Sequence, residues 1–161
     1  MRSRTPIVRQ ISWFTAIPQL LALALVIVVG VIFDPREGMI WGAAAFLAYT
    51  LGSRYLIAGH HRRGIALVKR QQFGEAISSF QRSLDFFDHR PWIDRFRCIV
   101  LMSPSATCYR EMALVNIAFC YSQIGDGNRA REYYEACLAR YPNSGMALAA
   151  LRLMDAARQA D

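Results

Sequence analysis

The pattern of apolar and polar positions divides the chain near residue 60. Before that point apolar residues run almost without interruption, and after it they recur every three or four positions between polar residues. The first pattern predicts helices that are apolar all round, whereas the second predicts amphipathic helices with one buried face. The sequence therefore predicts an all-α protein with an apolar N-terminal part and an amphipathic C-terminal part.

The N-terminal part predicts a transmembrane hairpin over residues 10–59. Residues 10–33 contain no charged side chain. As a helix at roughly 1.5 Å per residue, this run would be about 36 Å long, enough to cross a hydrocarbon core of about 30 Å. The turn at 34–38 reads DPREG, and the second apolar run, 39–59, is interrupted by Arg54. We expect Arg54 to reach the headgroups from the end of its span, and the alternative is a functional arginine within the membrane.

Small residues recur at helical spacing in the second apolar run. They are Gly38, Gly42, Ala44, Ala48 and Gly52. Small side chains let helices approach closely in lipid, so these positions predict membrane packing. The partner is either the first span of the same chain or a second copy, which would give a homo-oligomer.

The charges predict an orientation for this hairpin. Residues 1–63 carry seven arginines against Asp34 and Glu37, a net +5 of the +7 on the whole chain, and most of this excess flanks the apolar runs. The positive-inside rule places the basic segment 1–9 and everything after residue 59 in the cytoplasm. We expect a multi-pass protein of the bacterial inner membrane, with the lipid bilayer as one partner. No nucleic-acid partner is expected, because the folded part holds little of the excess charge.

The amphipathic part contains the same arrangement twice, in residues 64–87 and 118–142. Ala76, Phe80 and Ser83 in the first copy correspond to Ala130, Tyr134 and Cys137 in the second. Spacings of four and three place each trio on one helix face, where the small residues permit close approach and the ring fills the space beyond. A turn and another predicted helix precede each trio, so the pattern predicts two helical hairpins.

The two copies resemble the tetratricopeptide repeat, a helix–turn–helix unit of about 34 residues. The second copy carries Leu114, Ala118, Tyr121, Gly125, Ala130, Tyr134 and Pro142 at signature positions, with Ala118 in place of the family glycine. The first copy matches at Gly64, Ala76 and Phe80, departs at Gln71 and Asp88, and like the second lacks the usual tryptophan. The resemblance implies repeats at about 60–88 and 111–144 within a domain spanning 60–161.

A last helix is predicted at about 145–159 to cap the second repeat. Its apolar stripe is Met146, Ala149, Leu153 and Ala156, with Ala150 and Leu151 beside it, whereas Arg152, Asp155 and Arg158 are expected in solvent. Helical solenoids need such a terminal element to bury the apolar face of the last repeat. We therefore expect the stripe to face inward.

An insert at about 89–110 separates the repeats, since Ala76 and Ala130 lie 54 positions apart and the family period is about 34. It predicts a short extra helix with one of three roles. The helix could pack on the repeats as part of the core. It could instead lie at a membrane surface, with Trp92 and Phe96 toward lipid and Arg95 and Arg97 toward headgroups. The third role is to bind a partner.

The resemblance also implies a peptide-binding groove, because tetratricopeptide arrays bind segments of other proteins along the first helix of each repeat. The corresponding residues are His61, Ile65, Val68 and Lys69 in the first copy and Met112, Val115, Asn116 and Phe119 in the second. This floor is more apolar than charged and suits an apolar peptide or helix. The alternative is that the insert or the last helix already covers it.

The sequence offers no catalytic, cofactor-binding or metal-binding motif. Cys120 and Cys137 fall on apolar helix faces, where we expect buried, reduced thiols. The predicted function is therefore that of a non-enzymatic, membrane-anchored adaptor or scaffold that binds another protein. The alternative is an accessory structural subunit held in a larger membrane complex through the hairpin.

Overall fold

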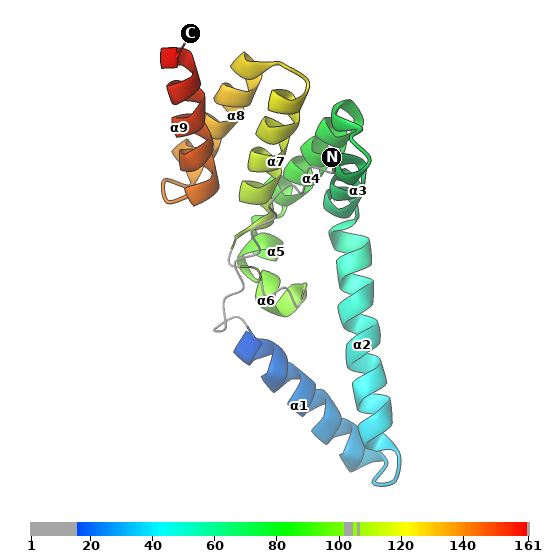
Figure 1. Cartoon of the computed structure of the whole chain (residues 1–161). Coiled ribbons are helices and arrows are strands. Elements are labelled where there is room, and N and C mark those ends of the chain that lie inside the picture. Colours follow the sequence, from blue (N-terminus) through cyan, green and yellow to red (C-terminus); the bar gives the residue numbers. More distant parts are fainter. Residues whose placement is uncertain (1–15, 102–104, 106, 161) are drawn as a thin grey trace. The chain divides into compact units, whose positions relative to one another are not determined.

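The computed structural model describes residues 16–101, 105 and 107–160, and the elements formed by these residues are helices (Figure 1). They are α1 (Ala16–Phe33), α2 (Gly38–Ile57), α3 (Gly59–Lys69), α4 (Phe73–His89), α5 (Pro91–Arg95), α6 (Arg97–Val100), α7 (Tyr109–Gln123), α8 (Gly127–Arg140) and α9 (Gly145–Ala160). The all-α prediction is confirmed. The predicted N-terminal segment 1–9 lies outside the described residues.

The chain forms two compact units, which we name here and describe separately. The hairpin unit comprises residues 1–54 and 96–107, and the repeat unit comprises residues 55–95 and 108–161. The predicted insert is therefore divided between the units, with α5 in the repeat unit and α6 in the hairpin unit.

In the hairpin unit, glycines bring α1 and α2 close together at the turn. A Cβ on Gly30 or Gly38 would collide with the backbone of the other glycine, and one on Gly42 would lie 2.9 Å from the Cα of Ile27. The Asp34 carboxylate orders the turn by accepting hydrogen bonds from the backbone N–H groups of Arg36 and Glu37. Gly38 and Gly42 thus pack within the chain, whereas an added Cβ on Gly52 would have no atom within 4 Å.

The predicted transmembrane hairpin, and the inner-membrane location derived from it, are contradicted. Among the described residues, no helix combines the length and the apolar character required to cross a membrane. Helix α1 has 18 residues, so at roughly 1.5 Å per residue it is about 27 Å long, shorter than a hydrocarbon core of about 30 Å. Helix α2 contains Thr50, Ser53 and Arg54, which lower its apolar character. The prediction had counted residues 10–15 in its first span, and these lie outside the described residues.

In the repeat unit, α3 with α4 and α7 with α8 form two helical hairpins, as the periodicity predicted (Figure 1). Helix α4 packs against both α3 and α7, and α9 packs on α8. One buried cluster joins Leu67, Ala76, Phe80, Ile117, Cys120 and Ala130 with their neighbours, and a second joins Leu114, Val115, Ala118, Tyr134, Cys137 and Ala147. Most signature residues of the two copies are therefore buried in the core, whereas Gly125 and Pro142 in the turns are exposed.

The turns of the two hairpins share a backbone conformation although their residues differ. Gly125 has a φ of 84° in the second turn, and Gln71, at the equivalent place in the first, has a φ of 61°. Glycine adopts this left-handed conformation without steric cost, whereas glutamine does so at a cost of about 1 kcal/mol or more. The departure of Gln71 from the family pattern thus leaves the turn geometry intact.

Helix α9 buries a different face from the predicted one. Ala147 is fully buried, and Ala150, Leu151 and Met154 pack against the second cluster. The predicted inward stripe faces outward instead, with Leu153 73% exposed and Met146 40% exposed. Because α9 is rich in alanine and leucine on both faces, periodicity alone did not distinguish them.

Candidate functional site

Helix α3 presents the first half of the predicted groove as a partly apolar surface. Ile65 and Val68 are half-buried and pack against the first cluster, and Lys69 is exposed beside them. Spacings of three and four residues place Ile65 and Val68 on the same helix face as His61. Ile65 and Val68 keep part of their surface available for a ligand.

His61 lies in the core and is not available to a ligand. Its side chain is 7% exposed, and its ring packs edge-on against those of Phe80 and Tyr109, each with a centroid separation of 5.3 Å. Its Nδ1 atom is buried and has no hydrogen-bond partner among the described residues. Burial lowers the pKa of His61 to about 4, against the smaller opposing effect of the Asp94 charge. The imidazole is therefore neutral at physiological pH.

Helix α7 presents the second half of the predicted groove. Met112, Asn116 and Phe119 are half-buried, whereas Val115 is 9% exposed and belongs to the second cluster. The Phe119 ring contacts that of Phe73 at the start of α4, with centroids 6.2 Å apart. Met112, Asn116 and Phe119 recur at spacings of four and three, so they form one row along α7.

The part of the insert in the repeat unit holds the start of α7. Asp94, 1% exposed, accepts hydrogen bonds from the backbone N–H of Tyr109 at 2.8 Å and of Arg110 at 3.3 Å, and from Arg110 Nε at 3.0 Å. It therefore caps the N-terminus of α7 from fifteen positions earlier in the chain. Ile93 is buried beside it, and Trp92 remains 56% exposed. Sequence reasoning had singled out Trp92 and missed Asp94, because nothing local marks an acidic residue as a cap for a distant helix.

The rest of the insert belongs to the hairpin unit. Arg97 donates to the backbone carbonyl of Ser105, and the Tyr49 hydroxyl donates to the carbonyl of Val100 at 3.1 Å. Phe96 is 49% exposed, and Arg95, on the repeat side of the division, is exposed as well. The predicted cluster of Trp92, Arg95, Phe96 and Arg97 is thus split between the two units.

The charges along α3 are basic and free of ion pairs among the described residues. Arg62, Arg63 and Lys69 are exposed and form no ion pair there, although Arg62 lies over the Tyr55 ring. The arginines of α7 and α8 that do form ion pairs are instead neutralised within the fold, as with Arg140 and Asp88 at 3.0 Å. The α3 edge of the surface therefore favours an acidic ligand.

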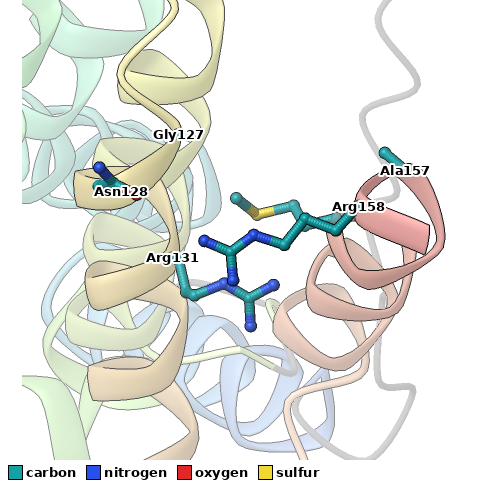
Figure 2. Close-up of a pocket in the computed structure, with 6 residues that line it drawn as sticks. Gly127, Asn128, Arg131, Ala157 and Arg158 are labelled. Carbon is teal, nitrogen blue, oxygen red and sulfur yellow. The ribbon is translucent and has the colours of Figure 1, made fainter. Parts of the chain in front are cut away.

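A pocket of about 260 Å³ lies between α8 and α9, away from the predicted groove residues. It is lined by Gly127, Asn128, Arg131, Met154, Ala157 and Arg158, and Figure 2 shows the arginine side chains reaching toward each other across it. Arg131 pairs with Asp155 and with Glu135, the latter at 3.6 Å. Because the positive charge of Arg131 is already matched by two carboxylates, we do not assign a ligand to this pocket.

The cysteines on the repeat helices are buried, as predicted. Cys120 and Cys137 are fully buried free thiols, and burial raises the pKa of Cys120 to about 12. A thiol with such a pKa is a poor nucleophile at neutral pH, because the reactive species is the thiolate. Among the described residues, no group of three or more histidine, cysteine or acidic side chains is arranged to hold a metal ion.

The fold and the arrangement of small and aromatic residues define a helical-hairpin repeat protein. Residues 112–144, which include most of α7, the whole of α8 and the turn that follows, match the family model of the tetratricopeptide repeat. The predicted resemblance is confirmed for the second copy. Neither the curated proteins nor the solved structures contain a significant match to the chain. Tetratricopeptide repeats generally mediate binding between proteins, and the family is typically non-catalytic.

Proposed function

We propose that this protein is a non-enzymatic adaptor that binds a segment of another protein on the surface formed by α3 and α7. The observation that carries the proposal is the row of half-buried apolar side chains, Ile65 and Val68 on α3 with Met112 and Phe119 on α7. Such side chains are held by the core on one side and can bury their remaining area against a ligand. The bound segment is an apolar peptide or helix.

The proposal can be tested with a displayed library of random peptides, selected for binding to the full-length protein. We expect the recovered peptides to be rich in apolar residues and to lose most of their affinity for Phe119→Ser, which removes the largest side chain of the row. Because Phe119 also contacts Phe73, Lys69→Glu serves as a second variant at an exposed position, and Arg82→Ala on α4 is the control. Recovery of no peptides, or of peptides that bind all these variants equally, would contradict the proposal.

One observation favours a second function, that of an accessory structural subunit in a larger protein complex. Apolar side chains of α1 are unusually exposed, including Leu21 at 66% and Leu25 at 64%. Exposed apolar surface of this kind commonly marks a protein interface, including one between copies of the same chain. If this function is correct, Leu21→Glu combined with Leu25→Glu will disrupt the native assembly, measured by its mass in sedimentation, while peptide binding to α3 and α7 persists.

A further inference from the structure

Helix α9 repeats the packing of α7 in the same register. Its inward residues Ala147, Leu151 and Met154 contact the cluster that includes Tyr134 and Cys137 of α8. The residues 34 positions earlier are Ala113, Ile117 and Cys120, which are buried on α7, the last two in the cluster of Ala76 and Phe80 on α4. An offset of 34 is the length of one tetratricopeptide repeat, so α9 packs on α8 as α7 packs on α4.

The same offset carries part of the row of α7 onto the exposed face of α9. Met112 and Phe119 correspond to Met146 and Leu153, whereas Asn116 corresponds to Ala150, which packs against the second cluster. Met146 and Leu153 are apolar and exposed. Val115 of α7 and Ala147 of α9 belong to the same buried cluster, together with Tyr134 and Cys137 of α8. By the register of 34 residues, Met146 and Leu153 form the third of a series of rows, after those of α3 and α7.

The face of α9 that would receive a further repeat helix is closed. On α7, Ala118 is fully buried and allows α8 to approach, as Gly64 allows Phe80 to approach on α3, where an added Cβ would lie 2.6 Å from the ring. The corresponding position on α9 holds Arg152, which is exposed. An arginine at this place blocks the close approach of another helix, so the array ends here and its apolar stripe is not the beginning of a further stack.

The charges beside the three rows indicate the chemistry of their ligand. Arg152 adjoins Leu153 on α9, Lys69 adjoins Val68 on α3, and neither forms an ion pair among the described residues. The acidic residue of α9, Asp155, already pairs with Arg131. Both ends of the series therefore present unmatched positive charge beside apolar side chains, a combination that complements an apolar segment with acidic residues on its flanks.

From this register and these charges we propose that α9 forms the third row of the binding surface. Its ligand is an apolar protein segment that carries acidic residues at both ends and spans the rows of α3, α7 and α9. The proposal deepens the function proposed above and rests on it. It assigns Leu153 the role on α9 that Phe119 has on α7, and it assigns Arg152 the role of an electrostatic anchor.

The test measures affinities of the library peptides for variants of the full-length protein. Since Leu153 is 73% exposed, Leu153→Ser leaves folding intact, and burying a leucine on binding predicts a rise in Kd of about tenfold or more. Arg152→Glu should also raise the Kd, with an effect that shrinks at high salt, whereas Arg82→Glu on α4 is the matched charge control.

The outcomes separate this proposal from the function on which it rests. If Phe119→Ser abolishes binding but Leu153→Ser and Arg152→Glu do not change it, the third row is wrong and the adaptor function stands. If no variant changes binding, or no peptide is recovered, both fail. Recovered peptides with basic rather than acidic flanks would overturn the ligand chemistry proposed here.

Discussion

At the scale of single residues, Gly64 sets how closely α3 approaches α4. A Cβ at this position would lie 2.6–2.8 Å from three atoms of the Phe80 ring, and that ring is fully buried and cannot move aside. Overpacking of this kind costs about 1–3 kcal/mol, more than the roughly 1 kcal/mol that alanine gains over glycine within a helix.

We therefore predict that Gly64→Ala lowers the free energy of unfolding by about 1–2 kcal/mol. Gly74→Ala in α4 is the matched control, since an added Cβ there meets no atom within 4 Å. The control should be neutral or slightly stabilising. Denaturant unfolding of the two variants checks the prediction, and equal stability of both would contradict it.

His61 predicts a dependence of stability on acid pH. Its folded-state pKa of about 4 lies below the ordinary value of 6.5, so the folded protein favours the neutral imidazole. The neutral imidazole therefore contributes to the free energy of unfolding. This contribution is complete above pH 6.5, is lost as the pH falls toward 4, and amounts to about 3 kcal/mol. His61→Phe keeps an aromatic ring between Phe80 and Tyr109 and should remove this loss. An unchanged pH profile of unfolding free energy between pH 6.5 and 4 in the variant would refute the assignment.

At the scale of elements, the link between α5 and α7 depends on Asp94. Removing its carboxylate leaves two backbone N–H groups of α7 and the Arg110 guanidinium without this acceptor. Because the Arg110 side chain is 26% exposed, water compensates part of the loss. We predict that Asp94→Ala costs about 2–3 kcal/mol of unfolding free energy. Asp88→Ala, which removes a partly exposed pairing with Arg140, should cost about 1 kcal/mol or less.

The thermal midpoints of these two variants provide the comparison. A midpoint for Asp94→Ala no lower than that for Asp88→Ala would show that the insert does not hold α7.

The orientation of α9 gives a second prediction at this scale. Leu151 packs against α8 and Leu153 faces outward, although they are only two positions apart. Leu151→Ala should therefore lower the unfolding free energy by about 1–2 kcal/mol, less than for a fully buried leucine. Leu153→Ala should change it by less than about 0.5 kcal/mol. Chemical denaturation of the two variants tests this order. If Leu153→Ala lowers the unfolding free energy more than Leu151→Ala does, the orientation of α9 predicted from the sequence is correct instead.

The elements were predictable where the sequence had a distinctive local signal. The trios beginning at Ala76 and Ala130 identified two hairpins, because small and aromatic residues at fixed spacing leave few other ways to pack. The inward face of α9 was not predictable, since its apolar residues are distributed on two faces. Asp94 was missed for another reason. It caps α7, which begins fifteen positions later in the chain, and no local sequence pattern predicts that the insert brings the two together.

At the scale of the whole molecule, the sequence predicts a division between the N-terminal helices and the repeats near residue 60, and the two compact units divide the chain after residue 54. The structure assigns residues 96–107 to the hairpin unit, although the sequence had placed them in one insert of the repeat domain. The predicted groove stays a prediction, and Ile65, Val68, Met112 and Phe119 on its floor are half-buried. His61 was expected to line that groove and instead lies in the core, because the neighbouring Tyr109 arrives only through the fold.

The central claim is that α3, α7 and α9 together bind a segment of another protein. Hydrogen–deuterium exchange of the full-length protein, with and without a peptide recovered from the library, tests it most directly. The account predicts slower exchange in α3, α7 and α9 on peptide binding, with smaller changes in α4 and α8. Slower exchange confined to α4 and α8, or to α1 and α2, would contradict it.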